Sequence, residues 1–207
     1  MTGHADQKQG VLIVLSAPSG AGKTTVANKL LKAVPGLERS ISHTTRPIRP
    51  GEKNGVDYHF VTKKEFEGMV ARDEFIEWAE VHGNLYGTAF ANIDDVVLKE
   101  KKDLLLVIDV QGARTLSRRG VEFCSIFLMP PSLEELKRRL AGRGSDPAEV
   151  MELRLRNAMD EVAEMGSFDY TVINGDLDQA VAEVAAIITA ERLKTKNRGL
   201  VFPDFNR

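Results

Sequence analysis

The segment 16–25, SAPSGAGKTT, has the residue types of a phosphate-binding loop and follows the apolar run VLIVL at 11–15. Backbone N–H groups of a glycine-rich turn can approach phosphate oxygens closely because few side chains intervene. The N-terminus of a following helix adds further donors. Lys23 would reach the outer phosphates, and the Thr24 hydroxyl would be a ligand for Mg²⁺. The segment therefore predicts a nucleoside triphosphate site made of Ala17, Pro18, Ser19, Gly20, Ala21, Gly22, Lys23, Thr24 and Thr25.

Ala17 departs from the usual pattern of such loops, which begins with glycine. Alanine fits at the exit of a strand when its φ is negative, and we expect an ordinary backbone conformation there. The alternative interpretation of this segment is a glycine-rich turn in which Lys23 has no special function. The buried strand expected before the loop and the amphipathic helix expected after it favour the phosphate site.

A second group of residues, in SHTTRPIRPGEKNGVDYHFV at 42–61, suits a small phosphate dianion. Arg46 and Arg49 lie three positions apart, and Tyr58 follows them. Guanidinium groups bind phosphate oxygens through paired hydrogen bonds, and a tyrosine hydroxyl adds another donor. Taken alone, each residue has an ordinary alternative, because exposed arginines are commonly solvated and tyrosines commonly pack in a core.

Asp109 closes the apolar run LLLVID at 104–109. An acidic side chain at the carboxyl edge of a parallel sheet can hold Mg²⁺ through water. The alternative is an N-cap for a helix that starts at Val110. The two interpretations are compatible, and the sequence favours a functional role.

Strands and helices are predicted to alternate along much of the chain. Apolar runs predict buried parallel strands at 11–15, 104–109 and 123–129, and YTVI at 170–173 is a shorter fourth candidate. Helical periodicity runs from Lys23 to Pro35-Gly36 and over 132–141, 147–165 and 177–193. Expected caps are Ser132 with Glu135, Asp146 followed by Pro147, and Asp176. This alternation predicts an α/β fold, with an open parallel sheet and helices on both faces. The phosphate loop after the first strand makes the sheet one of the P-loop NTPase type.

The segment 36–103 breaks that rhythm with short extended pieces and one helix, which Thr62 and Glu65 should cap. We interpret it as an inserted, mainly-β subdomain, and 132–165 as a helical hairpin rich in arginine. The prediction is one domain over 1–207. Its parts are a core at 10–35, 104–131 and 166–193, the inserted subdomain at 36–103, the hairpin at 132–165 and a C-terminal tail at 194–207.

Bulk composition argues against several classes of function. The net charge of −2 means that the protein as a whole does not attract nucleic acid or an anionic membrane. No apolar run approaches the length of a membrane span, and the polar start MTGHADQKQG lacks a signal-like segment. The single cysteine, Cys124, lies in an apolar run and should be a buried thiol. We therefore expect a cytoplasmic protein whose partners are small molecules.

The chain resembles the guanylate kinase family from about Val11 to Arg192. The motifs that carry the resemblance are SAPSGAGKTT, SHTTRPIRPGE-NG-DYHFV, EFIEWAEVHGNLYGT, IDVQG and RRLAGRG. The resemblance implies ATP as the phosphoryl donor, GMP as the acceptor in the inserted subdomain, and a lid over 132–165. It implies that Ser42, Arg46, Arg49, Tyr58 and Tyr86 hold the GMP phosphate, and that Glu77, Thr88 and Asp109 read guanine.

Guanine chemistry supports this assignment, because N1–H and N2–H₂ are adjacent donors that one carboxylate such as Glu77 can accept. Adenine lacks that pair and would leave a buried acceptor unpaired. Phosphoryl transfer also needs charge neutralisation around the moving group, which arginines on a closing lid supply. The residues to which the resemblance assigns catalysis are Lys23, Arg46, Arg139, Arg143 and Arg154.

Val107 stands where many family members have an acidic residue, so the resemblance leaves Mg²⁺ to Thr24, the phosphates and water. Two alternatives remain. A sugar-bisphosphate kinase on the same scaffold should lack the guanine readers Glu77 and Thr88. A non-catalytic guanylate-kinase-like module that binds proteins usually has a damaged phosphate loop, whereas Lys23 and Thr24 are intact.

Overall fold

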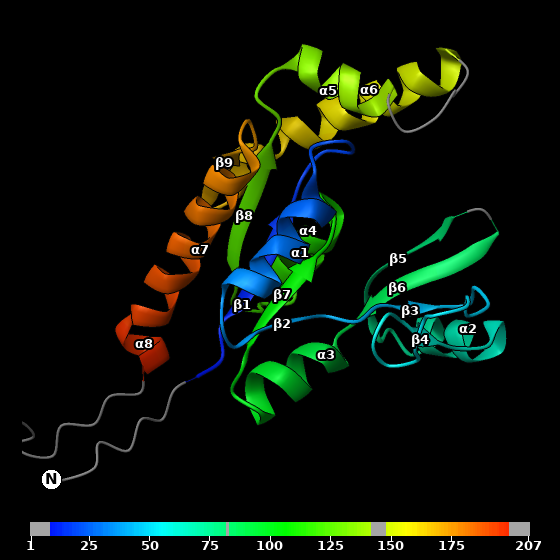
Figure 1. Cartoon of the computed structure of the whole chain (residues 1–207). Helices are drawn as coiled ribbons and strands as arrows, with labels where there is room; N and C mark the ends of the chain where they lie inside the picture. Colours follow the sequence, from blue (N-terminus) through cyan, green and yellow to red (C-terminus); the bar gives the residue numbers. More distant parts are fainter. Residues whose placement is uncertain (1–8, 82, 142–147, 199–207) are drawn as a thin grey trace, which may run out of the picture.

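A five-stranded parallel sheet forms the centre of the computed structural model, which describes residues 9–81, 83–141 and 148–198 (Figure 1). The central strand β1 pairs with a neighbour on either side, placing Leu12 opposite Leu104 and Ile13 opposite Cys124. The strand order reverses at β1, and ligands of open α/β sheets bind at the carboxyl edge of such a point. In spatial order the strands are β2 (Leu37–Arg39), β7 (Asp103–Val107), β1 (Leu12–Ser16), β8 (Cys124–Met129) and β9 (Tyr170–Ile173).

Helices cover both faces of this sheet, as the sequence predicted. Successive strand residues point to opposite faces. Ile13 and Leu15 therefore pack in a core with α1 (Lys23–Ala33) and α7 (Leu177–Leu193), whose bounds equal the prediction for 177–193. Leu12 and Val14 pack on the other side with α4 (Val110–Arg118). The α/β fold class is confirmed.

The strand predicted at 104–109 is shifted, because β7 begins at Asp103 and ends at Val107. Asp103 is fully buried; its carboxylate accepts a hydrogen bond from Val11 N at 2.9 Å and pairs with Arg192 at 2.6 Å. At the other end the Asp109 carboxylate caps α4, accepting from Gly112 N at 2.8 Å. The alternative interpretation of Asp109, a helix cap, is therefore observed, and the cap takes Asp109 out of the strand.

A second, four-stranded sheet lies beside the core in the order β4-β3-β6-β5 (Figure 1). The helix α2 (Lys63–Ala71) packs on it through Phe66, whose ring stacks on Phe75 at 4.4 Å. Thr62 and Glu65 form the predicted capping box. The strands are β3 (His43–Thr44), β4 (His59–Phe60), β5 (Phe75–Val81) and β6 (Asn84–Ala89).

Both ends of the predicted inserted segment, 36–103, contact the core. Strand β2 pairs with β7 in the core sheet. Ile93 of α3 (Ala91–Ile93), which continues as a π-helical segment over Asp94–Lys99, packs against Leu104 and Leu106 on the core. Sheet pairing and burial thus join both ends of the segment to the core.

The helical hairpin consists of α5 (Leu133–Ala141) and α6 (Ala148–Ala163), followed by a 3-10 turn at Met165–Ser167. The capping box predicted for α5 forms only in half. Ser132 Oγ accepts from Glu135 N at 3.1 Å, but the Glu135 carboxylate pairs with Arg138 and Arg139 in the described structure. The cap predicted for α6, at Asp146 and Pro147, lies outside the described residues.

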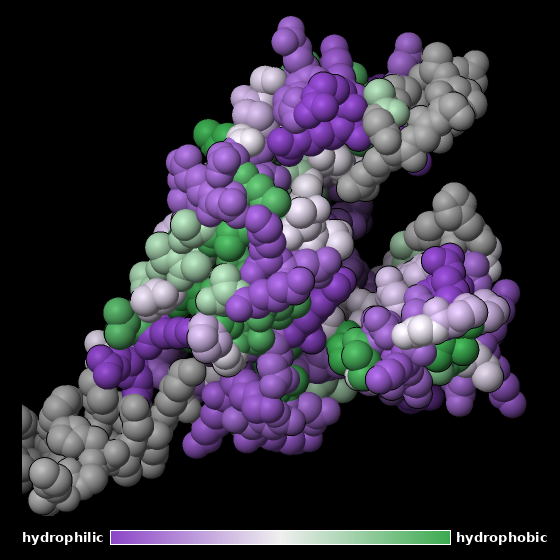
Figure 2. Space-filling model, viewed as in Figure 1, coloured by the Kyte–Doolittle hydropathy of each residue, from purple (hydrophilic) through white to green (hydrophobic). Residues whose placement is uncertain are grey.

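A short final helix, α8 (Thr195–Arg198), ends the described chain. Within the described ranges no helix combines the length and the hydropathy that a bilayer crossing needs. Cys124 is buried as expected, and burial raises the pKa of its thiol to about 12. Hydrophilic side chains cover much of the face in Figure 2, where a hollow opens between the second sheet and the upper part of the core, and the two touch below it.

Candidate functional site

The loop between β1 and α1 has the geometry expected of a phosphate loop. Gly20 and Gly22 have φ values of +89° and +94°, while Ala17 is not among the described residues with positive φ. The prediction for Ala17 is confirmed. Gly22 also permits a close approach, because a Cβ there would lie 2.5 Å from the Asn174 amide nitrogen. The loop thus leaves its N–H groups at the carboxyl edge of the central strand.

Lys23 begins α1 and crosses to the neighbouring strand. Its Nζ donates to the Ile108 carbonyl at 2.9 Å, just beyond the end of β7. Burial lowers the pKa of Lys23, and the nearby carboxylates of Glu77, Asp109 and Glu161 oppose that effect. The ammonium group therefore lies between the loop and a group of acidic side chains.

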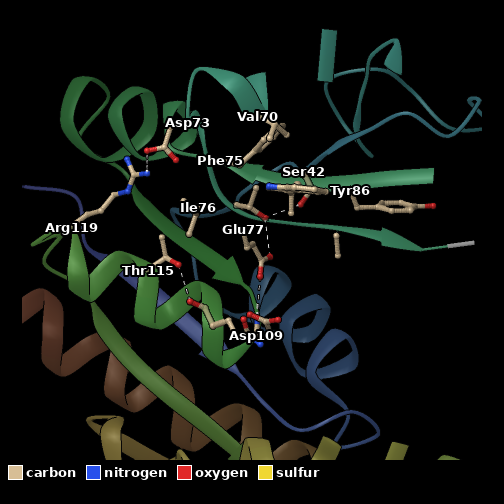
Figure 3. A pocket seen from close by; sticks show the side chains of 15 residues that line it. Ser42, Val70, Asp73, Phe75, Ile76, Glu77, Tyr86, Asp109, Thr115 and Arg119 are labelled. Atoms are coloured by element: carbon tan, nitrogen blue, oxygen red, sulfur yellow. Dashed lines mark hydrogen bonds and ion pairs between the residues drawn. The ribbon is translucent and has the colours of Figure 1, made fainter. Parts of the chain in front are cut away.

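A hydrogen-bonded row of side chains links the second sheet to Asp109 (Figure 3). Ser42 Oγ and Thr88 Oγ1 lie 3.3 Å apart, and Thr88 donates to Glu77 Oε1 at 3.3 Å. The other oxygen, Glu77 Oε2, accepts from Asp109 N at 3.4 Å. These residues line a cavity of about 460 Å³, and Tyr86 also lines it. The structure thus gathers Ser42, Glu77, Tyr86, Thr88 and Asp109, which lie far apart in the sequence.

Glu77 has the most informative electrostatic environment of this cavity. Burial, supported by the neighbouring Asp109 carboxylate, raises the pKa of Glu77 to about 7. Asp109 is the N-cap of α4, so its own carboxylate remains turned toward Gly112. A buried acceptor that is held partly protonated without ligand would be stabilised in its charged form by two adjacent donors.

The residues predicted to bind the GMP phosphate lie next to this cavity, and only some of them are close together. The Arg46 guanidinium lies 5.6 Å from the centre of the Tyr58 ring, and the Tyr58 and Tyr86 rings are 6.0 Å apart. Glu52 pairs with Arg46 at 2.7 Å and accepts from the backbone of Arg49 at 2.8 Å. The Arg49 side chain is exposed. Hydrogen bonding to Glu52, with a smaller contribution from Tyr86, raises the pKa of Arg46.

The arginines of the helical hairpin differ in position. Arg139 docks on the phosphate loop, donating to the Ala21 carbonyl at 3.3 Å and to the Asn174 carbonyl at 3.0 Å. Arg154 is half-buried on α6, and Arg143 lies outside the described residues. The structure thus places one of the three predicted lid arginines against the loop.

Comparison with known proteins decides the family. A sequence model described as guanylate kinase matches residues 9–191. The chain belongs to the guanylate kinase family. A guanylate kinase of Syntrophotalea carbinolica is 51% identical over 89% of this chain and 88% of its own length. One of Geobacter sulfurreducens is 47% identical over 91% and 93%.

Solved structures agree with the sequence relatives. The crystal structure of guanylate kinase from Anaplasma phagocytophilum has a TM-score of 0.70 and 39% identity, and the match covers 94% of this chain and 92% of that one. The phosphotransferase class and the P-loop fold expected for this member of the guanylate kinase family are therefore confirmed.

Three polar residues that contact the predicted site residues were missed by the sequence analysis. Asn174, just after β9, donates from its side chain to the Ala21 carbonyl at 2.7 Å, and Glu161 of α6 accepts from Ser19 N at 3.0 Å. Glu52 pairs with Arg46. Only Glu52 has a local signal, since it lies in the same turn as the arginines. A second hollow of about 390 Å³ lies beside the loop and is lined by Gly20, Gly22, Thr25, Arg138, Arg139, Asn174, Gly175 and Leu177.

Proposed function

We propose that this guanylate kinase transfers the γ-phosphoryl group of ATP to GMP across the space between Lys23 and Glu77. The supporting observation is that the two predicted sites meet at the end of β7. Lys23 is bonded to Ile108 O and Glu77 to Asp109 N, so adjacent residues connect the donor loop and the acceptor cavity. Phosphoryl transfer relies on positioning and charge stabilisation, which this convergence would supply.

In this proposal the phosphate loop holds the ATP phosphates through its N–H groups. Lys23 neutralises charge on the transferred group, and the hollow lined by Arg138 and Asn174 takes the rest of the donor. The donor-binding residues are Ala17, Pro18, Ser19, Gly20, Ala21, Gly22, Lys23, Thr24 and Thr25.

GMP takes the cavity beneath the second sheet. The Glu77 carboxylate accepts from guanine N1–H and N2–H₂, and Thr88 and Asp109 complete the contacts with the base. Arg46, with Tyr58 and Tyr86 beside it, binds the phosphate, which competes with Glu52 for the guanidinium. Ser42 and Arg49 complete the predicted acceptor set.

Arginines complete the catalytic group. Arg139 already lies on the loop, and Arg154 and Arg143 are assigned to the moving phosphoryl group by the family motif. Their charges would offset the negative charge spread over the phosphoryl oxygens.

A magnesium ion fits the donor site through Thr24. The Thr24 side chain is exposed on the first turn of α1, and a hydroxyl together with phosphate oxygens is a ligand set that Mg²⁺ accepts. Among the described residues no cluster of three or more His, Cys, Asp or Glu could hold a metal. We therefore propose that the ion is bound mainly by the nucleotide and supplies charge neutralisation. The cytoplasm, where both nucleotides occur, is the proposed location.

Release of ADP in a coupled assay with GMP, AMP and a ribose bisphosphate tests the acceptor. Turnover with GMP alone is expected. Preference for the sugar phosphate would favour the sugar-kinase alternative, and no turnover with any acceptor would favour a binding module. Glu77→Ala should raise the KM for GMP by about 10–100-fold, the effect of losing hydrogen bonds to a charged group, with little change for ATP. Glu80→Ala, an exposed position on the same strand, is the matched control.

A further inference from the structure

The phosphate loop of this structure already has an anionic partner from its own chain. Glu161 Oε2, on the hairpin helix α6, accepts a hydrogen bond of 3.0 Å from Ser19 N. Ser19 lies within the loop whose N–H groups the phosphates require. The carboxylate is half-buried, and this burial raises the pKa of Glu161, while the hydrogen bond from Ser19 and the charge of Lys23 oppose that effect.

The hairpin holds this carboxylate in place through its packing on the loop. Leu140 of α5 lies above Gly20, where a Cβ would come within 3.0 Å of the leucine side chain. Leu136 and Leu140 form a buried cluster with Ala158 of α6, one helical turn before Glu161. Arg139 fastens α5 to the Ala21 carbonyl. The packing of α5 and α6 against the loop therefore holds Glu161 on the side of the hairpin that contacts the loop.

A carboxylate and a phosphate are recognised by the same donors, since both are anions with oxygens that accept charge-assisted hydrogen bonds. Like charges held close together also repel strongly in a partly buried site. Glu161 and a bound triphosphate would thus compete for the Ser19 amide and for the field of Lys23.

We propose that Glu161 is an internal competitor for the phosphate loop: its carboxylate holds the Ser19 amide in the nucleotide-free protein and must leave when a triphosphate binds. The inference rests on the donor site proposed above. The contact stabilises the nucleotide-free protein relative to the nucleotide-bound protein. It therefore lowers the affinity for the nucleotide by the same free energy.

Calorimetric titration of the full-length protein with ATP, and separately with inorganic triphosphate, tests the proposal. Glu161→Gln removes the charge, and Glu161→Ala also removes the acceptor. Both variants should bind each ligand about tenfold more tightly than wild type, the scale of one charge-assisted hydrogen bond. Asp160→Asn, which neutralises an exposed carboxylate on the same helix, should leave the affinity within about twofold.

Thermal unfolding supplies a readout that a purely structural role would not produce. Without ligand, Glu161→Ala should melt below wild type, whereas the rise in Tm on adding saturating ATP should be larger in the variant. Unchanged or weaker binding of both ligands by the Glu161 variants would overturn the proposal, as would an equal gain in Asp160→Asn. If wild type bound neither ATP nor triphosphate, the proposed donor site itself would fail.

The wild-type protein gives a test that does not depend on how the variants fold. The carboxyl ¹³C resonance of Glu161 should shift as ATP saturates the protein, because its hydrogen bond to Ser19 is broken. A resonance that stays fixed through saturation would overturn the competition.

Discussion

The Glu77 carboxylate rests against Gly112, so closely that a Cβ on Gly112 would lie 2.9 Å from Glu77 Oε2. Gly112 is in the first turn of α4, and its own N–H is capped by Asp109. The absence of a side chain at this helical position is what lets the carboxylate reach the amide of Asp109. A core helix thereby fixes a side chain that belongs to the second sheet.

Gly112→Ala should therefore damage the acceptor site without unfolding the protein. The added methyl group would push the Glu77 carboxylate out of place, while alanine favours a helix by about 1 kcal/mol relative to glycine. We expect the KM for GMP to rise about tenfold and the KM for ATP to stay unchanged, measured by steady-state kinetics. Gly166→Ala, where nothing lies within 4 Å of the new Cβ, is the control. Equal kinetics for both variants would refute the steric argument.

The affinity for guanosine should depend on pH through Glu77. Without ligand the pKa of Glu77 is about 7, and donors from guanine favour the charged carboxylate. Binding should therefore release a proton and tighten as pH rises from 6 to 8. Guanosine is the probe because it has no phosphate that titrates in this range. The affinity of Glu77→Gln for guanosine should not change between pH 6 and 8. If it changed with pH as much as the affinity of the wild type does, another group would release the proton.

Ionisation of Glu77 should lower the stability of the ligand-free protein as pH rises, whereas it raises the affinity for guanosine. The folded-state pKa of Glu77 lies above the unfolded value of 4.5, so its favourable contribution is complete below that value and is lost as pH rises through about 7. In the ligand-free protein Glu77→Gln should raise Tm relative to wild type more at pH 8 than at pH 5. A Tm difference independent of pH would contradict this.

Lys23→Ala should lower kcat about a thousandfold with both substrates saturating, because one ammonium near the transferred group is lost. Circular dichroism should show an intact fold, since Val26, Ala27 and Leu30 still pack α1 on the sheet. Lys29→Ala, at an exposed position of the same helix, should keep normal turnover. Activity of Lys23→Ala near that of wild type would remove the lysine from the mechanism.

Arg192→Ala should lower the free energy of unfolding by about 3 kcal/mol, because it removes the charge that pairs with the fully buried Asp103. Urea denaturation would measure the loss, and Arg118→Ala on the exposed side of α4 should cost less than about 0.5 kcal/mol. A loss below about 1 kcal/mol for Arg192→Ala would show that other contacts of Asp103 suffice.

Local patterns predicted most of the framework correctly. The strand at 170–173 and the helix at 177–193 have the predicted bounds, and Thr62 and Asp176 are caps as expected. These features depend on periodicity and on hydrogen bonds between near neighbours, which the order of residues specifies. The differences from prediction have two causes. Glu135 turns to Arg138 and Arg139, its neighbours one turn along α5, because an ion pair competes with the capping box. Strand β2 pairs with β7, which is distant in the sequence, and so joins the core sheet.

The sequence by itself determined the phosphate loop, the alternation of strands and helices, and a family resemblance that assigned the residues of both substrate sites. Only the tertiary structure decided that Glu161 meets Ser19, that Gly112 makes room for Glu77, and that Arg192 neutralises Asp103. The physical reason is range: a loop or a helix cap is built by neighbours along the chain. A contact between distant segments exists only once burial of the apolar faces has fixed where the helices and sheets lie.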